Sequence, residues 1–285
     1  MAAAGRAVGS DLTMSKPTSG TGQPAVPAAV PTRWSARFFL VWIAILAGLE
    51  LFVQSGAEKS FFLPAPSSVA VSLGQMIADG TLAPHLTATL TRIVLGLLVG
   101  AGLGVLLGLA MGTSRRLRRV IDPLVAAIHP VPRLAFFPLL IVVLGVGETS
   151  KLAAVSMGAF FPMLLNTVAG VRGMNPVHLE LARNYGATRR QMFLHVLLPG
   201  SMPLMLTGLR LSANVAFHST IGVEMVGSRL GIGSLLWLSW QTFRIDHLYA
   251  ILVIIAAIGI GLASLIRWVT QRSAPWMTDT TPSAA

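Results

Sequence analysis

Polar residues recur at helical spacing within the apolar stretch 203–225, and they are the groups in this chain best placed for binding chemistry. At about 100° per residue they fall within an arc of about 120° on one helix, and they are Arg210, Asn214, His218 and Glu224, with Ile221 among them. Polar groups at membrane depth usually face a bundle interior or a water-filled path, because lipid offers them no partner. We expect this face to line a pathway, with Asn214 and His218 nearest to a solute. Two alternatives stay open: these groups join helices through hydrogen bonds, and Glu224 belongs to an outer gate or a structural ion pair.

A second polar cluster interrupts the apolar sequence at residues 171–200, which include ELARNYGATRRQMFLHVLLP. Asn175 is a good N-cap residue, and Pro176 suits the first helical position, where its missing N–H is not needed. A helix that begins there carries an apolar stripe at four-residue spacing, made of Val177, Leu181 and Tyr185.

The glycine in the middle of this cluster predicts a corner. Gly186 is able to take a positive φ without strain after the first helix. Thr188 and Gln191 have the spacing of a capping box for a second helix. We expect this helix to cover residues 189–198 and to end at Pro199. From these residues alone, a helix pair lying in the lipid headgroups is an open alternative.

Sequence signatures of enzymes are absent. The chain has neither a Gly-x-Ser-x-Gly elbow nor a His-Glu-x-x-His helix, and its six histidines have no metal-ligand spacing. None of its lysines lies in a Gly-Lys-Ser/Thr phosphate loop, which excludes that route to ATP binding. The chain has no cysteine for thiolate chemistry. We expect no catalytic residue, no metal and no cofactor.

The composition predicts an integral membrane protein. The 285 residues are 54% hydrophobic and only 11% charged, which is too apolar for an ordinary soluble surface. The net charge of +11 would also suit a nucleic-acid-binding protein, but a basic excess in a multispanning protein usually marks the cytoplasmic loops. We therefore expect contact with membrane lipid and none with nucleic acid.

Six apolar segments are candidates to cross the hydrocarbon core, which needs about 20 residues. They are residues 36–55, 90–112, 122–145, 150–170, 203–225 and 248–270. Prolines in HPVPRLAFFPLL interrupt the third segment, so a helix there must bend or break. The predicted fold class is an all-α membrane protein with six transmembrane helices.

Basic residues predict the orientation. Fourteen Lys and Arg lie near the termini, at 115–119 and at 172–190, against four on the opposite side: Lys59, Lys151, Arg229 and Arg244. By the positive-inside rule, both termini and the 171–200 loop are cytoplasmic, which requires an even number of spans.

The same reasoning divides the chain into three parts. Residues 1–35 are mostly small or polar and have no signal-peptide core, so we expect a disordered cytoplasmic tail. The membrane domain covers 36–272, with a core at about 84–270. A short cytoplasmic tail, 273–285, follows.

Two further patterns concern packing. Glycines repeat every four residues in the second span, so another helix can approach closely there; they are Gly96, Gly100, Gly104, Gly108 and Gly112. Before this span, an amphipathic helix is expected from about Ser67 at the outer membrane surface. Its apolar face contains Val69, Leu73, Met76 and Ile77.

The 171–200 loop resembles the signature loop of permease subunits of bacterial ABC importers. That signature is Glu-Ala-Ala, three residues, Gly, nine residues, then Ile-x-Leu-Pro. The spacing is intact here, in Glu180, Leu181, Ala182, Gly186, Val196, Leu198 and Pro199. Leu181 and Val196 are apolar departures. FFLPAPSSVAVSL, PLLIVVLGVGETSK and GLRLSANVAF are similar to the subfamily that imports nitrate, sulfonates, taurine and related small molecules, over roughly residues 60–270.

The resemblance implies the fold and assembly of a type I ABC importer. Its permease works as a homodimer in the bacterial inner membrane, with cytoplasmic ABC ATPase subunits and a periplasmic or lipid-anchored solute-binding protein. The solute would be a small organic anion such as an alkanesulfonate, taurine or nitrate. The loop would be a coupling helix that docks on the ATPase, through Glu180, Leu181, Ala182, Tyr185, Gly186, Val196, Leu198 and Pro199. A secondary transporter or channel of six spans is the alternative; internal repeats would favour it, and none is convincing.

Overall fold

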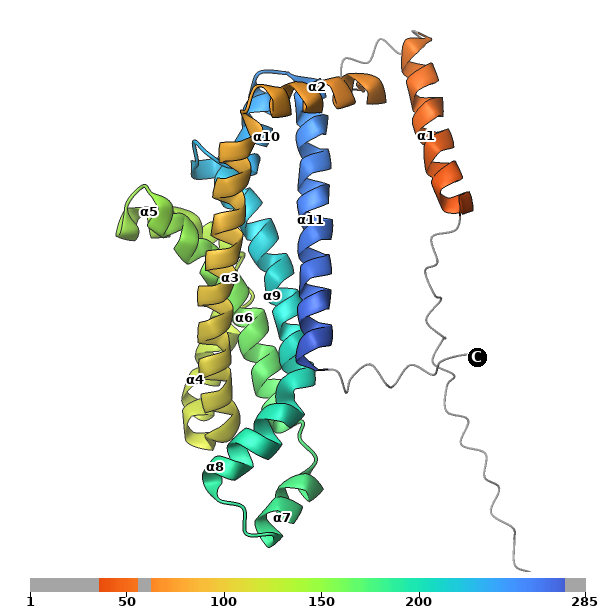
Figure 1. Ribbon diagram of the computed structural model, residues 1–285. Helices are drawn as coiled ribbons and strands as arrows, with labels where there is room; N and C mark the ends of the chain where they lie inside the picture. Colours follow the sequence, from red (N-terminus) through yellow and green to blue (C-terminus); the bar gives the residue numbers. More distant parts are fainter. Residues whose placement is uncertain (1–35, 56–62, 275–285) are drawn as a thin grey trace, which may run out of the picture. The chain divides into compact units, whose positions relative to one another are not determined.

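The computed structural model describes residues 36–55 and 63–274, and all regular structure in these ranges is helical (Figure 1). Within these ranges, four helices are long and apolar enough to cross a membrane. They are α3 (Leu82–Thr113), α6 (Glu148–Arg172), α9 (Leu198–Gly227), together with the short segments that precede it, and α11 (Ile245–Ser273). Helix α6 packs along both α3 and α9, and α11 lies beside α9.

The glycine repeat of α3 is the surface on which α6 packs. A Cβ atom on Gly104 would lie 2.8 Å from the carbonyl oxygen of Phe160, and one on Gly108 would lie 2.6 Å from the Cβ of Thr167. Gly102, which is off the repeat, has no atom of residues 36–55 or 63–274 within 4 Å of its Cβ position. The predicted close approach of a second helix is therefore confirmed.

The third predicted span is broken. Helix α4 (Arg115–Ile128) is followed by the short η1 (Arg133–Phe136) and α5 (Phe137–Leu144), and the two parts meet at an angle of 93°. The break falls where Pro130 and Pro132 lack the N–H groups that a continuous helix needs. The predicted bend is confirmed, and the described residues hold up to five spans if the bent pair counts as one.

The first predicted span corresponds to α1 (Ala36–Gln54). Residues up to Ile45 form a unit separate from the rest of the chain, so α1 is characterised by its own sequence. Its apolar portion within the described residues, Leu40–Gln54, is shorter than a full span. The count of six spans stays a prediction, and the predicted tail 1–35 lies outside the described residues.

Two shorter helices lie at one end of α11. Helix α2 (Pro66–Ala78) begins close to the predicted position, and its Met76 packs in one apolar cluster with Ile251 of α11. Helix α10 (Ile232–Gln241) contributes to the same cluster. Ile77 is exposed, because consecutive helical residues point about 100° apart.

The polar loop contains α7 (Pro176–Asn184), a corner and the one-turn α8 (Arg189–Gln191). A wider π-helical segment, η2 (Met192–Leu197), then leads directly into α9. The expectation that the second helix ends at Pro199 is wrong, because Arg189–Gly227 is one continuous helix.

Pro199 and the glycine after it have other roles than ending this helix. Pro199 is the second residue after the π-helical segment and lies in the first turn of α9, where the regular α-helical hydrogen bonds have not yet begun, so its missing N–H interrupts none of them. Gly200 leaves room for the side chain of Met174, which a Cβ atom would overlap.

Candidate functional site

The corner of the polar loop has the geometry that its residues predict. The side chain of Asn175 caps α7 by accepting a hydrogen bond from the backbone two residues later, at 3.0 Å. Gly186 has φ +74°, and its N–H donates to the carbonyl oxygen of Arg183 at 2.9 Å. The N–H of Ala187 donates to the carbonyl oxygen of Ala182 at 3.0 Å. Together these two bonds form a Schellman motif.

The second helix of the corner begins with the predicted capping box. Thr188 Oγ1 accepts from the N–H of Gln191 at 3.3 Å, and Gln191 Oε1 accepts from the N–H of Thr188 at 2.9 Å. Both helix ends that meet at Gly186 are therefore satisfied by neighbouring residues, and the shape of the corner is determined locally.

Helix α7 leaves its apolar stripe uncovered. Val177, Leu181 and Tyr185 are 61%, 53% and 84% exposed. Glu180, beside this stripe, forms no ion pair with any residue that the structure describes. An apolar stripe with an adjacent free carboxylate on a protruding loop has the chemistry of a protein-binding surface.

The remaining residues of the predicted coupling set lie elsewhere. Ala182 flanks the stripe on the edge opposite to Glu180 and is half-buried. Val196, Leu198 and Pro199 are half-buried where the loop joins α9. The structure thus divides the set into an exposed group on α7 and a group at the base of the loop.

Asn214 and His218 of α9 line one cavity of about 330 Å³. His218 Nδ1 lies 2.7 Å from the carbonyl oxygen of Asn214 and donates to it, since a carbonyl only accepts. Arg133, from the break between α4 and α5, lines the same cavity. Sequence reasoning missed this arginine, and its one signal was its place in the proline-rich HPVPRLAFF.

The other residues predicted on this face of α9 do not line this cavity and lie in three different environments. Arg210 lines a second cavity of about 230 Å³ with Arg267 of α11, and Asn214 borders both cavities. Ile221 packs in the apolar cluster beneath α2. Glu224 turns into the interior and is fully buried.

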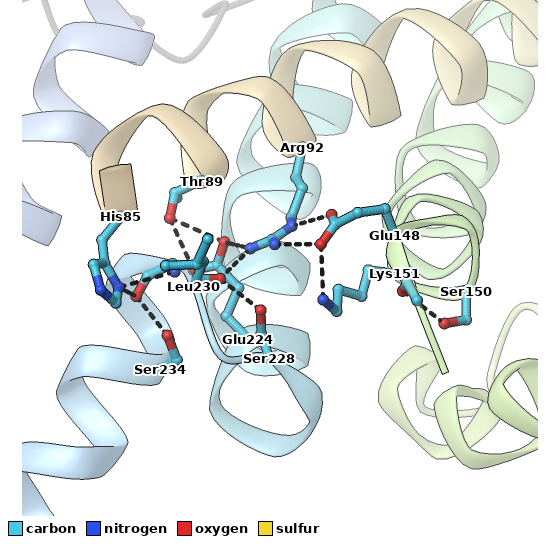
Figure 2. Close-up of polar contacts among 12 residues, drawn as sticks. His85, Thr89, Arg92, Glu148, Ser150, Lys151, Glu224, Ser228, Leu230 and Ser234 are labelled. Atoms are coloured by element: carbon cyan, nitrogen blue, oxygen red, sulfur yellow. Dashed lines mark hydrogen bonds and ion pairs between the residues drawn. The ribbon is translucent and has the colours of Figure 1, made fainter. Parts of the chain in front are cut away.

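Glu224 is held in an ion network (Figure 2). Arg92 of α3 donates through Nη1 to Glu224 Oε1 at 2.6 Å. Thr89 Oγ1 lies 2.9 Å from both carboxylate oxygens, and the N–H of Gly233 donates to Oε2 at 2.9 Å. A desolvated carboxylate requires such partners. Of the two alternatives for Glu224, the geometry favours the structural ion pair.

The network continues from Arg92 to the start of α6. Its Nε and Nη2 each donate to one oxygen of Glu148 at 2.7 Å, which is the bidentate geometry of the strongest ion pairs. Lys151 Nζ donates to Glu148 Oε1 at 2.9 Å. Glu148 is 66% exposed, whereas Glu224 has no exposure, so the network joins α3, α6 and α9 from the core to the surface.

The loop after α9 closes over this network. Arg92 Nη1 also donates to the carbonyl oxygen of Leu230 at 2.6 Å. Gly231 has φ +139°, and a side chain there would overlap the carboxylate of Glu224. Glycine is needed because the backbone crosses directly over the buried charge.

Similarity to known proteins provides an independent observation. Residues 100–279 match the family described as binding-protein-dependent transport system inner membrane component. The taurine transport system permease protein of Escherichia coli (strain K12) is 34% identical over 220 residues, covering 75% of this chain and 80% of that protein. A Bacillus subtilis (strain 168) protein named for the transport of aliphatic sulfonates is 33% identical over 232 residues, covering 81% and 84%. The formylaminopyrimidine transport permease protein of Halalkalibacterium halodurans is 30% identical over 218 residues, covering 76% and 87%.

Two solved structures share the fold. An inward-facing MetNI methionine ABC transporter superposes with a TM-score of 0.52 at 20% identity, covering 66% of this chain and 90% of that chain. An amino acid ABC transporter crystallised with histidines superposes with a TM-score of 0.57 at 19% identity, covering 71% and 97%.

Proposed function

The chain belongs to the family of binding-protein-dependent transport system inner membrane components, and we propose that it forms the translocation pathway for a small organic anion. It is an ABC importer permease subunit and not itself an enzyme. The proposed solutes are an alkanesulfonate or taurine, or the small inorganic anion nitrate, and ATP is hydrolysed by a partner subunit.

The choice of an anion is supported by two relatives and by one cavity. The relatives are named for taurine and for aliphatic sulfonates. Another relative is named for a formylaminopyrimidine, so membership of the family does not by itself select the charge of the solute. The cavity beside Asn214 and His218 includes the cationic Arg133, and this favours an anion.

The observation that carries the coupling role is the exposed stripe of α7 on a locally rigid corner. We propose that residues 171–200 dock in a groove of a cytoplasmic ABC ATPase, with Leu181 and Tyr185 as apolar contacts. Glu180 would pair there with a basic group of the ATPase, since it has no described partner in its own chain. A solute-binding protein would deliver the anion from the opposite side of the membrane.

We propose a type I importer architecture for the membrane part. Two copies of the chain would form a homodimer in lipid, each with six spans and both termini in the cytoplasm of a bacterium. The support is the four long apolar helices, the bent pair and the apolar α1, together with the distribution of Lys and Arg.

Reconstituted vesicles test this function. The permease, its ATPase and its binding protein are expected to take up taurine or ethanesulfonate only when ATP is supplied inside and the binding protein outside. An ATPase whose phosphate-loop lysine is replaced is the matched control and should abolish uptake. Uptake that collapses with an ionophore but ignores ATP would identify a secondary transporter instead.

A further inference from the structure

The cavity beside α9 is lined by the cationic Arg133. Its Nε atom is buried and has no hydrogen-bond acceptor in the described ranges of the chain. Among the residues that the structure describes, this guanidinium also has no salt bridge. Buried N–H groups are nearly always paired in native proteins, so an unpaired one marks a place for a ligand or water.

Arg133 is positioned by residues on both sides of the helix break. Phe137, one turn later, is 1% exposed and packs with Ala154 of α6 and Val223 of α9. Leu134 lies against Gly222, where an added Cβ would come within 3.3 Å of its side chain. The segment is therefore held between α6 and α9, and the fold sets the backbone position from which Arg133 extends.

The lining of the cavity matches a small anion with a short apolar part. Its polar side has Asn214, His218 and Ser219, and its apolar side includes Leu134 and Val215. No acidic residue is among the described residues that line it. Its volume of about 330 Å³ is at the small end of the range for ligand pockets.

On the basis of the proposed function, we propose that Arg133 binds the anionic head group of the solute within the permease itself. A guanidinium presents paired donors that fit oxyanions better than a single ammonium does. Asn214 supplies a further donor through its side-chain amide. His218 already donates Nδ1–H to its own helix, which leaves only Nε2 of its ring to face the cavity, and Arg133 is the charged contact.

Because the chain has no cysteine, a thiol introduced at this site is the only thiol in the protein, and its chemical modification can be measured directly. His218→Cys places a single thiol in the cavity of the full-length chain. Its reaction rates are measured with an anionic reagent, 2-sulfonatoethyl methanethiosulfonate, and a cationic one, 2-trimethylammonioethyl methanethiosulfonate. Each rate is divided by that of Tyr185→Cys on the exposed loop. The thiol of His218→Cys should prefer the anionic reagent, and adding Arg133→Gln should lower this preference roughly tenfold.

A matched variant separates a local contact from the general field of the protein. Arg210→Gln removes the same charge from α9, but from the neighbouring cavity, and should leave the preference nearly unchanged. Arg133→Lys should retain most of it, because the charge stays. Equal elution volumes and thermal midpoints establish that each variant is folded. An unchanged preference in Arg133→Gln, or equal losses in Arg133→Gln and Arg210→Gln, would overturn the proposal.

Ethanesulfonate serves as the solute probe in the same preparation. It should slow the modification of the thiol in His218→Cys when Arg133 is present and have no effect when Arg133→Gln is added. Absence of protection in the arginine-containing chain would also contradict the proposal. This readout needs neither ATP nor an ATPase, so its failure leaves the importer assignment intact, and failure of ATP-driven uptake leaves the charge preference measurable.

Discussion

Gly186 determines the angle between α7 and the helix that continues into α9. Its φ of +74° lies in a region that β-branched residues enter only under strain, whereas asparagine enters it more readily. No atom of the described part of the chain lies within 4 Å of the position that its Cβ would occupy. Backbone conformation, and not space, therefore restricts the residue type at this corner.

This difference predicts opposite outcomes for two substitutions. Gly186→Val should strain the corner by about 1–3 kcal/mol, leave the chain inserted and sharply lower the amount of ATPase that co-purifies with it. Gly186→Asn, which adds a side chain of similar size, should retain most of that association. Wild-type association of the valine variant would mean that α7 is an interfacial helix in the headgroups, without a coupling role.

A second prediction at this scale concerns the two cations around Glu148. Arg92→Met leaves Glu224 buried without a countercharge and should destabilise the chain by about 3 kcal/mol or more. Lys151→Met removes a partner only from the exposed Glu148 and should lower the free energy of unfolding by about 1 kcal/mol or less. Thermal midpoints in one detergent compare the two. Adding Glu224→Met to Arg92→Met should recover part of the loss, and failure to do so would place the defect in packing.

At the scale of elements, α6 contacts the face of α3 that carries the glycine repeat, where hydrogen atoms stand in place of side chains. The repeat positions bring the backbone of α3 against Phe160 and Thr167 of α6. In a membrane such close packing replaces the hydrophobic driving force that soluble helices use. The ion network then joins these two helices to α9 at one end.

One substitution on two faces of α3 tests this contact. Gly104→Val should force the helices apart and abolish recovery of a monodisperse protein, because its Cβ would overlap Phe160. Gly102→Val adds the same side chain two residues away, where space is open, and should be nearly neutral. Size-exclusion profiles at equal expression provide the comparison. Similar behaviour of both variants would show that the interface tolerates a wider separation.

Much of the loop was predictable because its determinants are local. Caps, the capping box and the positive φ at Gly186 depend on residues a few positions apart. The partners of Arg92 were not predictable, since they lie 56 and 132 positions away and Arg92 stands alone in an apolar span. Arg133 was missed because its place beside α9 depends on the 93° bend. The prolines indicate that the helix bends, but they do not indicate in which direction.

At the scale of the whole molecule, the proposed ATPase surface and the proposed anion site lie in different parts of the bundle, both connected to α9. Helix α7, which carries the exposed stripe, lies beyond one end of the long helices (Figure 1). The cavity of the anion site is lined by the C-terminal half of α9, from Asn214 to Val223, whereas the loop joins α9 at its other end. A defect in docking should therefore be separable from a defect in solute binding.

Charge reversal at two ends of the molecule provides that separation. Glu180→Lys should reduce ATPase association without altering thermal stability, because Glu180 has no described ion pair in its own chain. Asp246→Lys makes the same change in the first turn of α11, where Asp246 accepts a hydrogen bond from Ser68 of α2, and should leave association unchanged. Co-purification and solute-stimulated ATP hydrolysis measure both. Equal effects would indicate a nonspecific response to added positive charge.

The unbroken helix Arg189–Gly227 also has a mechanical consequence. It is pinned to α6 where Ser212 Oγ donates to the carbonyl oxygen of Ala159 at 2.7 Å. If the helix pivots at this point, the part from Ser212 to Arg189 is about 35 Å long and the part from Ser212 to His218 is about 9 Å long. We expect a push of about 4 Å at the loop to reach the cavity as about 1 Å, with the force multiplied about fourfold in a rigid rod. Spin-label distances from α6 to each end, with and without the ATPase, would reveal these unequal strokes, and equal strokes would mean that η2 bends as a joint.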